Sequence, residues 1–95
     1  MSKRNKRLTI WKNNTPKTAP KHEVEAILEY YLPENNSWEG GSHIVIQHDE
    51  LLNEQQYKPF GQVSIPCSGG QRFKGVYLKE LVKVLEILDL WHEEE

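Results

Sequence analysis

The chain has 95 residues and a mass of 11.1 kDa, enough for one domain, since longer chains divide at roughly 100–200 residues per domain. No apolar run approaches the ~18 residues of a membrane span, and no apolar stretch follows the basic start as it would in a secretory signal. The single cysteine, Cys67, excludes an intramolecular disulfide and a cysteine-rich zinc site. We therefore expect one soluble, cytoplasmic domain.

The net charge of −2 conceals a strong asymmetry along the chain. Residues 1–21 contain seven of the 12 basic residues and no acidic residue, so the remaining 74 residues carry five basic against 14 acidic side chains. Blocks of like charge are most often solvated surface. A second interpretation is that Lys3, Arg4, Lys6 and Arg7 form an arm that contacts RNA phosphates. A third is that the basic start and the acidic end only attract each other.

Residues 1–18 are predicted to form a basic, partly flexible arm, because asparagine, proline and threonine discourage regular structure in its second half. Within this arm Leu8, Ile10 and Trp11 are expected to form a short strand or to pack onto the domain. The domain itself is expected over residues 19–92, and an acidic tail over residues 93–95.

The first helix is predicted from Val24, Ile27, Leu28 and Tyr31, which recur at the i, i+3, i+4, i+7 spacing of a buried helical face. Pro33 is expected to end this helix, because proline cannot continue it.

Two strands are predicted next. Residues 42–48 are rich in β-branched side chains. The period of two divides this strand into two faces, with His43, Val45 and Gln47 on one and Ile44, Ile46 and His48 on the other. After a long polar connection at residues 49–59, the second strand places three side chains on one face and ends near Pro66: Val63, Ile65 and Cys67. A further short strand around residues 37–40 is inferred because a two-stranded hairpin alone is only marginally stable.

The last helix is predicted from Val76 to about Trp91 by a wide apolar stripe. Its members are Leu78, Leu81, Val82, Leu85 and Leu88. The predicted fold class is therefore α+β, in the order α-β-β-β-α, with two helices on one face of a three-stranded antiparallel sheet.

The sequence contains no Walker loop, no dinucleotide-binding glycine fingerprint and no HExxH pair. His43 and His48 fall on opposite faces of the predicted strand, which argues against a shared metal ion, and we expect neither a metal nor a cofactor. His43 opens the strand directly after Gly-Gly-Ser, where a bulky substrate can approach the backbone closely. A histidine can give or take a proton at neutral pH. The alternative is a hydrogen-bonded structural histidine.

Three segments, taken in order, resemble the HicA toxin family, which is also called YcfA-like. They are Gly41-Ser42-His43 at the start of an apolar strand, Val63-Ser64-Ile65-Pro66 at the end of the next, and Lys74-Gly75-Val76-Tyr77-Leu78-Lys79 at the start of the last helix. The resemblance covers roughly residues 21–91. It implies the double-stranded-RNA-binding-like fold of that family.

The resemblance further implies an mRNA interferase of a toxin–antitoxin pair, with mRNA as substrate and a HicB-like antitoxin as partner. The catalytic histidine of the family is that of Gly-Ser-His, which here is His43. In metal-independent RNA cleavage a base takes the proton of a ribose 2′-OH, the oxygen attacks the adjacent phosphate, and an acid protonates the leaving oxygen. RNA contacts are assigned by their place near the loop and the start of the last helix: Gly41, Ser42, Arg72, Lys74 and Lys79.

The chain departs from the pattern of the family in several positions. Family members commonly carry a basic residue before Gly-Ser-His, where this chain has Glu39-Gly40. Ile44 stands where a second histidine is frequent, and Gln47 where a basic residue is frequent. These departures remove positive charge from the expected RNA face. Two function classes are therefore carried forward: a ribonuclease that uses His43 as general acid or base, and a non-catalytic module that binds RNA or a protein.

Overall fold

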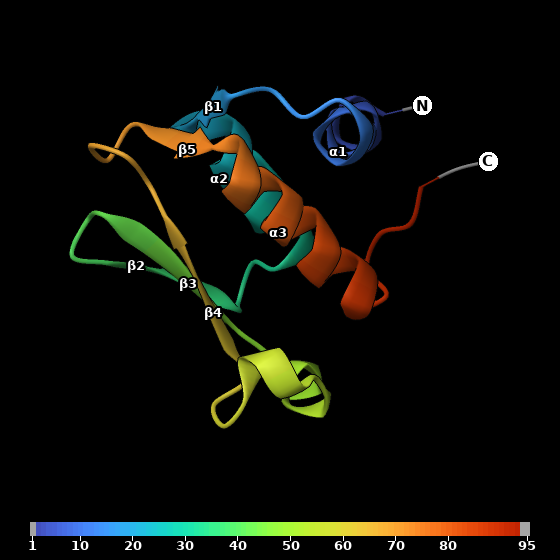
Figure 1. The fold of residues 1–95 in the computed structure, drawn as a ribbon, viewed down its shortest axis with the longest axis vertical. Helices are drawn as coiled ribbons and strands as arrows, with labels where there is room; N and C mark the ends of the chain where they lie inside the picture. The colour runs from blue at the N-terminus through green and yellow to red at the C-terminus, as the bar shows by residue number, and fades with distance from the viewer. Residues whose placement is uncertain (1, 94–95) are drawn as a thin grey trace.

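The computed structural model describes residues 2–93 and has an α+β fold with helices and antiparallel sheets, as predicted for the class (Figure 1). Within this range there are three α-helices: α1 (Lys3–Asn13), α2 (Lys21–Tyr31) and α3 (Gly75–Ile87). The larger sheet has the strand order β2-β3-β4, formed by β2 (Asn36–Glu39), β3 (His43–Gln47) and β4 (Gln62–Pro66). The smaller sheet pairs β1 (Thr18–Pro20) with β5 (Arg72–Lys74). None of the described helices is long and apolar enough to cross a membrane.

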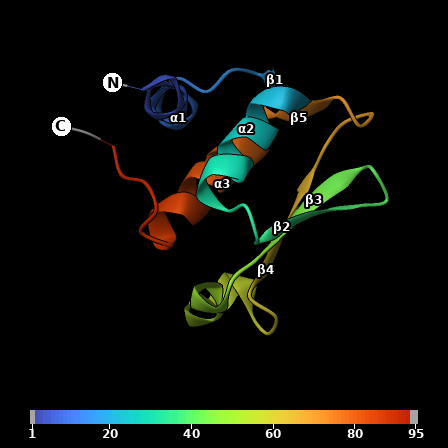
Figure 2. The ribbon, with the colours of Figure 1, turned by 180° about the vertical axis from the view of Figure 1, so that it is seen from behind.

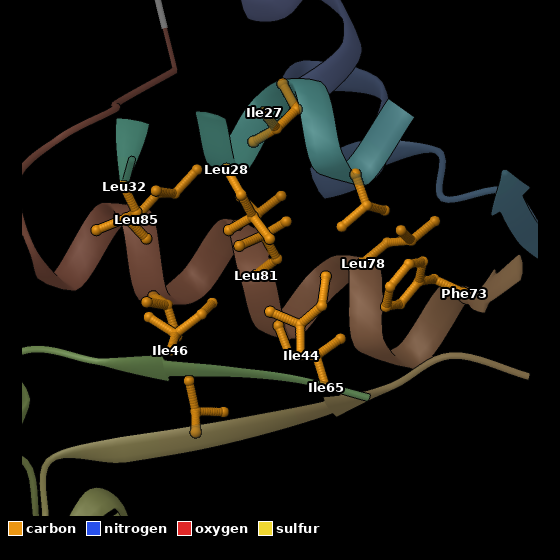
Figure 3. Packing of buried hydrophobic residues seen from close by; sticks show 14 of the residues in the cluster. Ile27, Leu28, Leu32, Ile44, Ile46, Ile65, Phe73, Leu78, Leu81 and Leu85 are labelled. Atoms are coloured by element: carbon orange, nitrogen blue, oxygen red, sulfur yellow. The ribbon is translucent and has the colours of Figure 1, made fainter. Parts of the chain in front are cut away.

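The core lies between the larger sheet and the helices α2 and α3, which cover the same side of it (Figure 3). Ile44 and Ile46 of β3 point toward α3 together with Ile65 of β4 (Figure 3), and all three are buried. The alternation predicted for β3 and β4 is therefore confirmed. Burying a side chain of this size contributes roughly 1.5–3 kcal/mol of stability. These buried isoleucines therefore help to hold the sheet against the helices.

Residues 3–13 form helix α1, so the prediction of irregular structure for this part of the chain was wrong. The hydroxyl of Ser2 caps the helix by accepting a hydrogen bond from the backbone N–H of Asn5 at 3.1 Å. Leu8 and Trp11 lie one turn apart and are buried, whereas Ile10 stays 46% exposed. The expected packing onto the domain is thus confirmed for two of the three apolar residues. Residues 94–95 of the expected acidic tail lie outside the described range.

Helix α1 is tied to the C-terminal part of the chain by polar contacts. The indole N–H of Trp91 donates a buried hydrogen bond of 2.6 Å to the side-chain oxygen of Asn5. At the other end of α1, the ammonium of Lys12 lies 2.6 Å from a carboxylate oxygen of Glu86 and 3.7 Å from one of Glu93. One residue of the basic start, Lys12, therefore pairs with the acidic end, and these contacts do not test whether such attraction is the only role of the basic residues.

The smaller sheet was not predicted, because three-residue strands are too short to reveal an alternation. Its pair Ala19 and Phe73 is buried. Directly after β5, Gly75 donates its backbone N–H to the carbonyl oxygen of Lys17 at 2.8 Å. A Cβ on Gly75 would lie only 2.5 Å from the carbonyl oxygen of Pro16, so the start of α3 requires a residue without a side chain.

We therefore expect Gly75→Ala to lower the free energy of unfolding by roughly 1–3 kcal/mol, because the backbone must move to make room for the methyl group. Without that contact the same change would stabilise a helix, since alanine is about 1 kcal/mol better than glycine there. Urea unfolding of wild type and variant measures the difference. A higher midpoint for Gly75→Ala would show that the contact with Pro16 is easily relieved.

Helix α3 ends at Ile87 rather than continuing to Trp91, so the predicted C-terminal boundary was too late. Asp89 adopts φ +58°, and the backbone N–H of Leu90 donates back to the carbonyl of Leu85 at 2.9 Å. A residue in this left-handed conformation commonly ends a helix and turns the chain. The turn returns Trp91 to the core, where it is 6% exposed.

The predicted polar connection at residues 49–59 contains two short 3₁₀ helices, η1 (Asp49–Asn53) and η2 (Gln55–Tyr57). Leu51 and Tyr57 are buried within it. The hydroxyl of Tyr57 donates a hydrogen bond of 2.6 Å to a carboxylate oxygen of Glu80 on α3. This connection is therefore attached to the core rather than a simple surface loop.

This attachment makes stability depend on pH. Burial, with the hydrogen bond to Glu80, raises the pKa of Tyr57 above its ordinary value of 10.0. Above about pH 10 the folded state keeps the proton of Tyr57, whereas the unfolded chain releases it. The contribution of Tyr57 to the free energy of unfolding is therefore complete below about pH 10 and is lost as the pH rises further.

We expect Tyr57→Phe to reduce the alkaline loss of unfolding free energy by up to about 1.4 kcal/mol per pH unit. Urea unfolding at several alkaline pH values measures the slope, with Tyr30→Phe as the control at an exposed tyrosine. Equal slopes for wild type and Tyr57→Phe would contradict the assignment.

Candidate functional site

His43 is the first residue of β3 and lies between the two edge strands of the larger sheet. Its backbone partners are Glu39 on β2 and Pro66 on β4. Because Ile44 is in the core, His43 lies on the outer face of the sheet, which is the face away from α2 and α3. The side chain is half-buried. The prediction that His43 opens a strand is confirmed.

The imidazole of His43 has one hydrogen-bonding partner in the adjacent residue. The hydroxyl oxygen of Ser42 lies 3.1 Å from Nδ1 of His43. A hydroxyl can donate to or accept from this nitrogen, according to the tautomer of the ring. In either case Nε2 is the nitrogen that remains for a substrate, so the contact sets which end of the ring can exchange a proton.

Two glycine turns meet beside the start of β3, and together with Ser42 we call them the double-glycine end: Gly40, Gly41, Ser42, Gly69 and Gly70. All four glycines have φ between +60° and +71°, a conformation that other residues rarely adopt. A Cβ on Gly70 would lie 3.3 Å from the carbonyl oxygen of Gly41, so the two backbones approach closely.

The carbonyl of Ser42 also accepts a hydrogen bond of 2.8 Å from the N–H of Cys67, which joins the turn before β3 to the chain leaving β4. Both turns lie on the side of the molecule opposite the chain termini (Figures 1 and 2). The double-glycine end is thus a region of small residues, in which the N–H of Ser42 donates to the carbonyl of Glu39 at 3.3 Å and that of Gly70 to the carbonyl of Cys67 at 3.1 Å.

The three basic residues predicted to contact RNA lie in different places: Arg72, Lys74 and Lys79. Arg72 is joined to the double-glycine end through its backbone, because the N–H of Ser68 donates to its carbonyl at 2.7 Å. Its side chain instead donates from Nε to the hydroxyl of Thr18 at 2.8 Å, toward β1. Lys74 is the residue before α3, Lys79 lies on that helix, and both are exposed. Among residues 2–93, no hydrogen bond or ion pair joins any of these three side chains to His43.

A hollow of about 440 Å³ lies on the outer face of the sheet, and its lining includes three carboxylates. We call it the acidic hollow, and its acidic residues are Glu34, Glu39 and Asp49. Val45 and Gln47 of β3 also line it. Glu39 connects the acidic hollow with His43, because the two residues are direct partners across the hairpin. In the sequence, Glu39 is notable only because the family commonly has a basic residue just before Gly-Ser-His. The hairpin spacing Glu-Gly-Gly-Ser-His also indicates that Glu39 stands opposite His43.

His48, which follows β3 and also lines the acidic hollow, and Cys67 both have structural roles. Nδ1 of His48 accepts a hydrogen bond of 3.0 Å from the N–H of Glu50 and so caps η1. Cys67 is buried, and this burial raises the pKa of its thiol, which keeps it protonated and a poor nucleophile. Within residues 2–93, no group of three or more His, Cys, Asp and Glu side chains is arranged to hold a metal ion.

Comparisons with known proteins were made for the whole chain. No family model matches it, and searches of curated proteins and of solved structures gave no significant match. The functional assignment therefore has to come from the geometry around His43 and from the sequence segments that resemble the HicA family.

Proposed function

We propose that this protein is a HicA-like mRNA interferase that cleaves RNA without a metal ion, with His43 as general acid or base. The observation that carries this proposal is the setting of His43, whose Nδ1 contacts Ser42 at 3.1 Å and which directly follows the double-glycine end. We propose that α2, β2, β3, β4 and α3 form a HicA-like core and correspond to the α-β-β-β-α elements of the double-stranded-RNA-binding-like fold. Helix α1 and the pair β1-β5 are additions to it.

The chemistry follows from what RNA offers at each linkage. With Nδ1 engaged by Ser42, Nε2 of His43 takes the proton of a ribose 2′-OH or gives one to the leaving 5′-oxygen. The 2′-oxygen attacks the neighbouring phosphorus, and the bond to the 5′-oxygen breaks. One positioned acid or base contributes about 10²–10⁴-fold to the rate.

Negative charge develops on the phosphate oxygens during this step and needs hydrogen-bond donors. We assign the backbone N–H of Gly41 to this role, and that of Ser42 once it leaves the carbonyl of Glu39, to which it donates at 3.3 Å. Arg72 is the cation that we assign to the scissile phosphate, because its backbone is joined to the same end of the sheet at Ser68. Lys74 and Lys79 are assigned to more distant phosphates. The partner that inhibits the enzyme is a HicB-like antitoxin, and the compartment is the cytoplasm.

A second function, a non-catalytic binding module, is favoured by the acidic hollow. Glu39 stands opposite His43, and Glu34 and Asp49 extend the negative charge along the same face. Carboxylates repel a phosphate backbone, whereas they suit a basic protein segment.

One experiment separates the two functions. Purified protein is incubated with mixed mRNA in EDTA, and binding is measured separately with a 2′-O-methyl RNA, which lacks the attacking hydroxyl. Cleavage of mRNA supports the interferase. Binding of the 2′-O-methyl RNA without cleavage of mRNA supports an RNA-binding module, and neither result, with the protein folded, leaves a protein-binding module.

A further inference from the structure

A second hollow of about 320 Å³ is lined mainly by residues of helix α1. The ribbon of α1 lies well away from the larger sheet (Figures 1 and 2). Its lining residues define what we call the α1 groove: Lys3, Lys6, Arg7, Ile10, Trp11, Pro16 and Glu23. The volume is at the lower end of the roughly 300–1,000 Å³ typical of ligand pockets. It is enough for one or two large side chains of a partner.

The apolar and the basic parts of the α1 groove lie on one face of the helix. Lys3, Lys6 and Ile10 are spaced by three and four residues, so successive side chains stand one turn apart. Ile10 is 46% exposed although it lies beside the buried Trp11. An exposed isoleucine between a buried indole and two lysines is a surface that an apolar side chain with acidic neighbours would cover.

The charges in the α1 groove are only partly balanced within the molecule. Arg7 lies 3.6 Å from a carboxylate oxygen of Glu23, so these two residues pair with each other. Lys3 and Lys6, in contrast, have no acidic side chain within salt-bridge distance among residues 2–93. The groove therefore presents two unpaired positive charges, although the chain after residue 21 is strongly acidic.

We propose that the α1 groove binds an acidic amphipathic segment of another protein, with an apolar side chain against Ile10 and Trp11 and carboxylates on Lys3 and Lys6. RNA is the less suitable occupant for two reasons. Two lysines neutralise only about two phosphates, against the 6–10 contacts of typical nucleic-acid binders. The carboxylate of Glu23 and the apolar lining also offer nothing to a phosphate backbone. This inference does not rest on the role of His43.

The test uses the full chain and a fluorescein-labelled helical peptide with leucines on one face and glutamates on the other. We expect Lys6→Glu and Ile10→Ser each to weaken binding at least about tenfold, since one reverses a charge pair and the other removes the apolar contact. Lys58→Glu is the matched control, because it makes the same charge change at an exposed site outside the groove. In ¹H–¹⁵N NMR spectra, the indole N–H signal of Trp11, one of three tryptophans, should move on binding.

Four outcomes would overturn the proposal. The first is no binding of the peptide, and the second is binding that Lys6→Glu and Ile10→Ser leave unchanged. The third is that a 2′-O-methyl RNA moves the Trp11 signal and loses affinity with Lys6→Glu, which would make the groove a nucleic-acid surface. A peptide in which the leucines are replaced by serines separates charge attraction from groove binding: equal affinity of the two peptides would also contradict it.

Discussion

For the proposed interferase, His43→Ala is expected to lower the rate of RNA cleavage about 10²–10⁴-fold, because the variant lacks the proposed general acid or base. Substrate binding should change little, since the histidine contributes one contact among several. The measurement is cleavage of mixed mRNA by wild type and variant, in EDTA and at equal concentrations. Affinity for a 2′-O-methyl RNA is measured in parallel.

His22→Ala is the control for this experiment, because His22 is an exposed histidine on α2, a different element from His43. It should cleave like wild type. If His43→Ala and wild type cleave equally, the activity belongs to another site or to a contaminant. Ser42→Ala tests the positioning of the ring: losing the partner of Nδ1 should reduce the rate without abolishing it and should shift the pH profile. An unchanged pH profile would assign Ser42 no part in positioning His43.

Trp11→Ala is expected to lower the free energy of unfolding by about 3–5 kcal/mol, the usual cost of removing a buried tryptophan. A domain of this length has a total stability of about 5–14 kcal/mol, so the loss is a large fraction of it. The reason is that Trp11 is only 2% exposed and belongs to the same core as α3. Urea unfolding measures the effect.

Ile10→Ala, at the exposed neighbouring position, should change stability by about 0.5 kcal/mol or less. If Trp11→Ala does not fold, Trp11→Phe keeps most of the volume and gives a smaller loss in the same direction. A Trp11→Ala variant as stable as wild type would mean that α1 contributes nothing to the core. The first 18 residues would then behave as the flexible arm that composition suggests.

The sheet and α3 could be predicted because their apolar residues are numerous and periodic. Ile44 and Ile46 alternate on β3, and the stripe on α3 is repeated over several turns. Helix α1 could not be predicted in this way, because Leu8 and Trp11 are only two buried apolar residues among many charges. Helix α1 is held in place by partners distant in sequence, such as Trp91, which bonds to Asn5 from 86 residues away. No local sequence pattern indicates such a partner.

The candidate site also has one part that the sequence predicts and another that it does not. The place of His43 follows from the alternation of β3, and its pairing with Glu39 follows from the hairpin. The acidic hollow does not, because Glu34, Glu39 and Asp49 come from three separate segments that only the folded sheet brings together. The side chain of Arg72 was also unpredictable, since its partner Thr18 belongs to a strand of three residues.

The contacts of Asn5 with Trp91 and of Lys12 with Glu86 have a consequence for synthesis on the ribosome. Helix α1 is synthesised well before the residues that cover it, and the contact of Asn5 with Trp91 closes a loop over a sequence separation of 86 residues. During translation Leu8 and Trp11 have no complete surface to pack against, and a nascent chain keeps them accessible until α3 has emerged. A chain interrupted before α3 would leave this apolar pair without the surface that buries it in the folded protein.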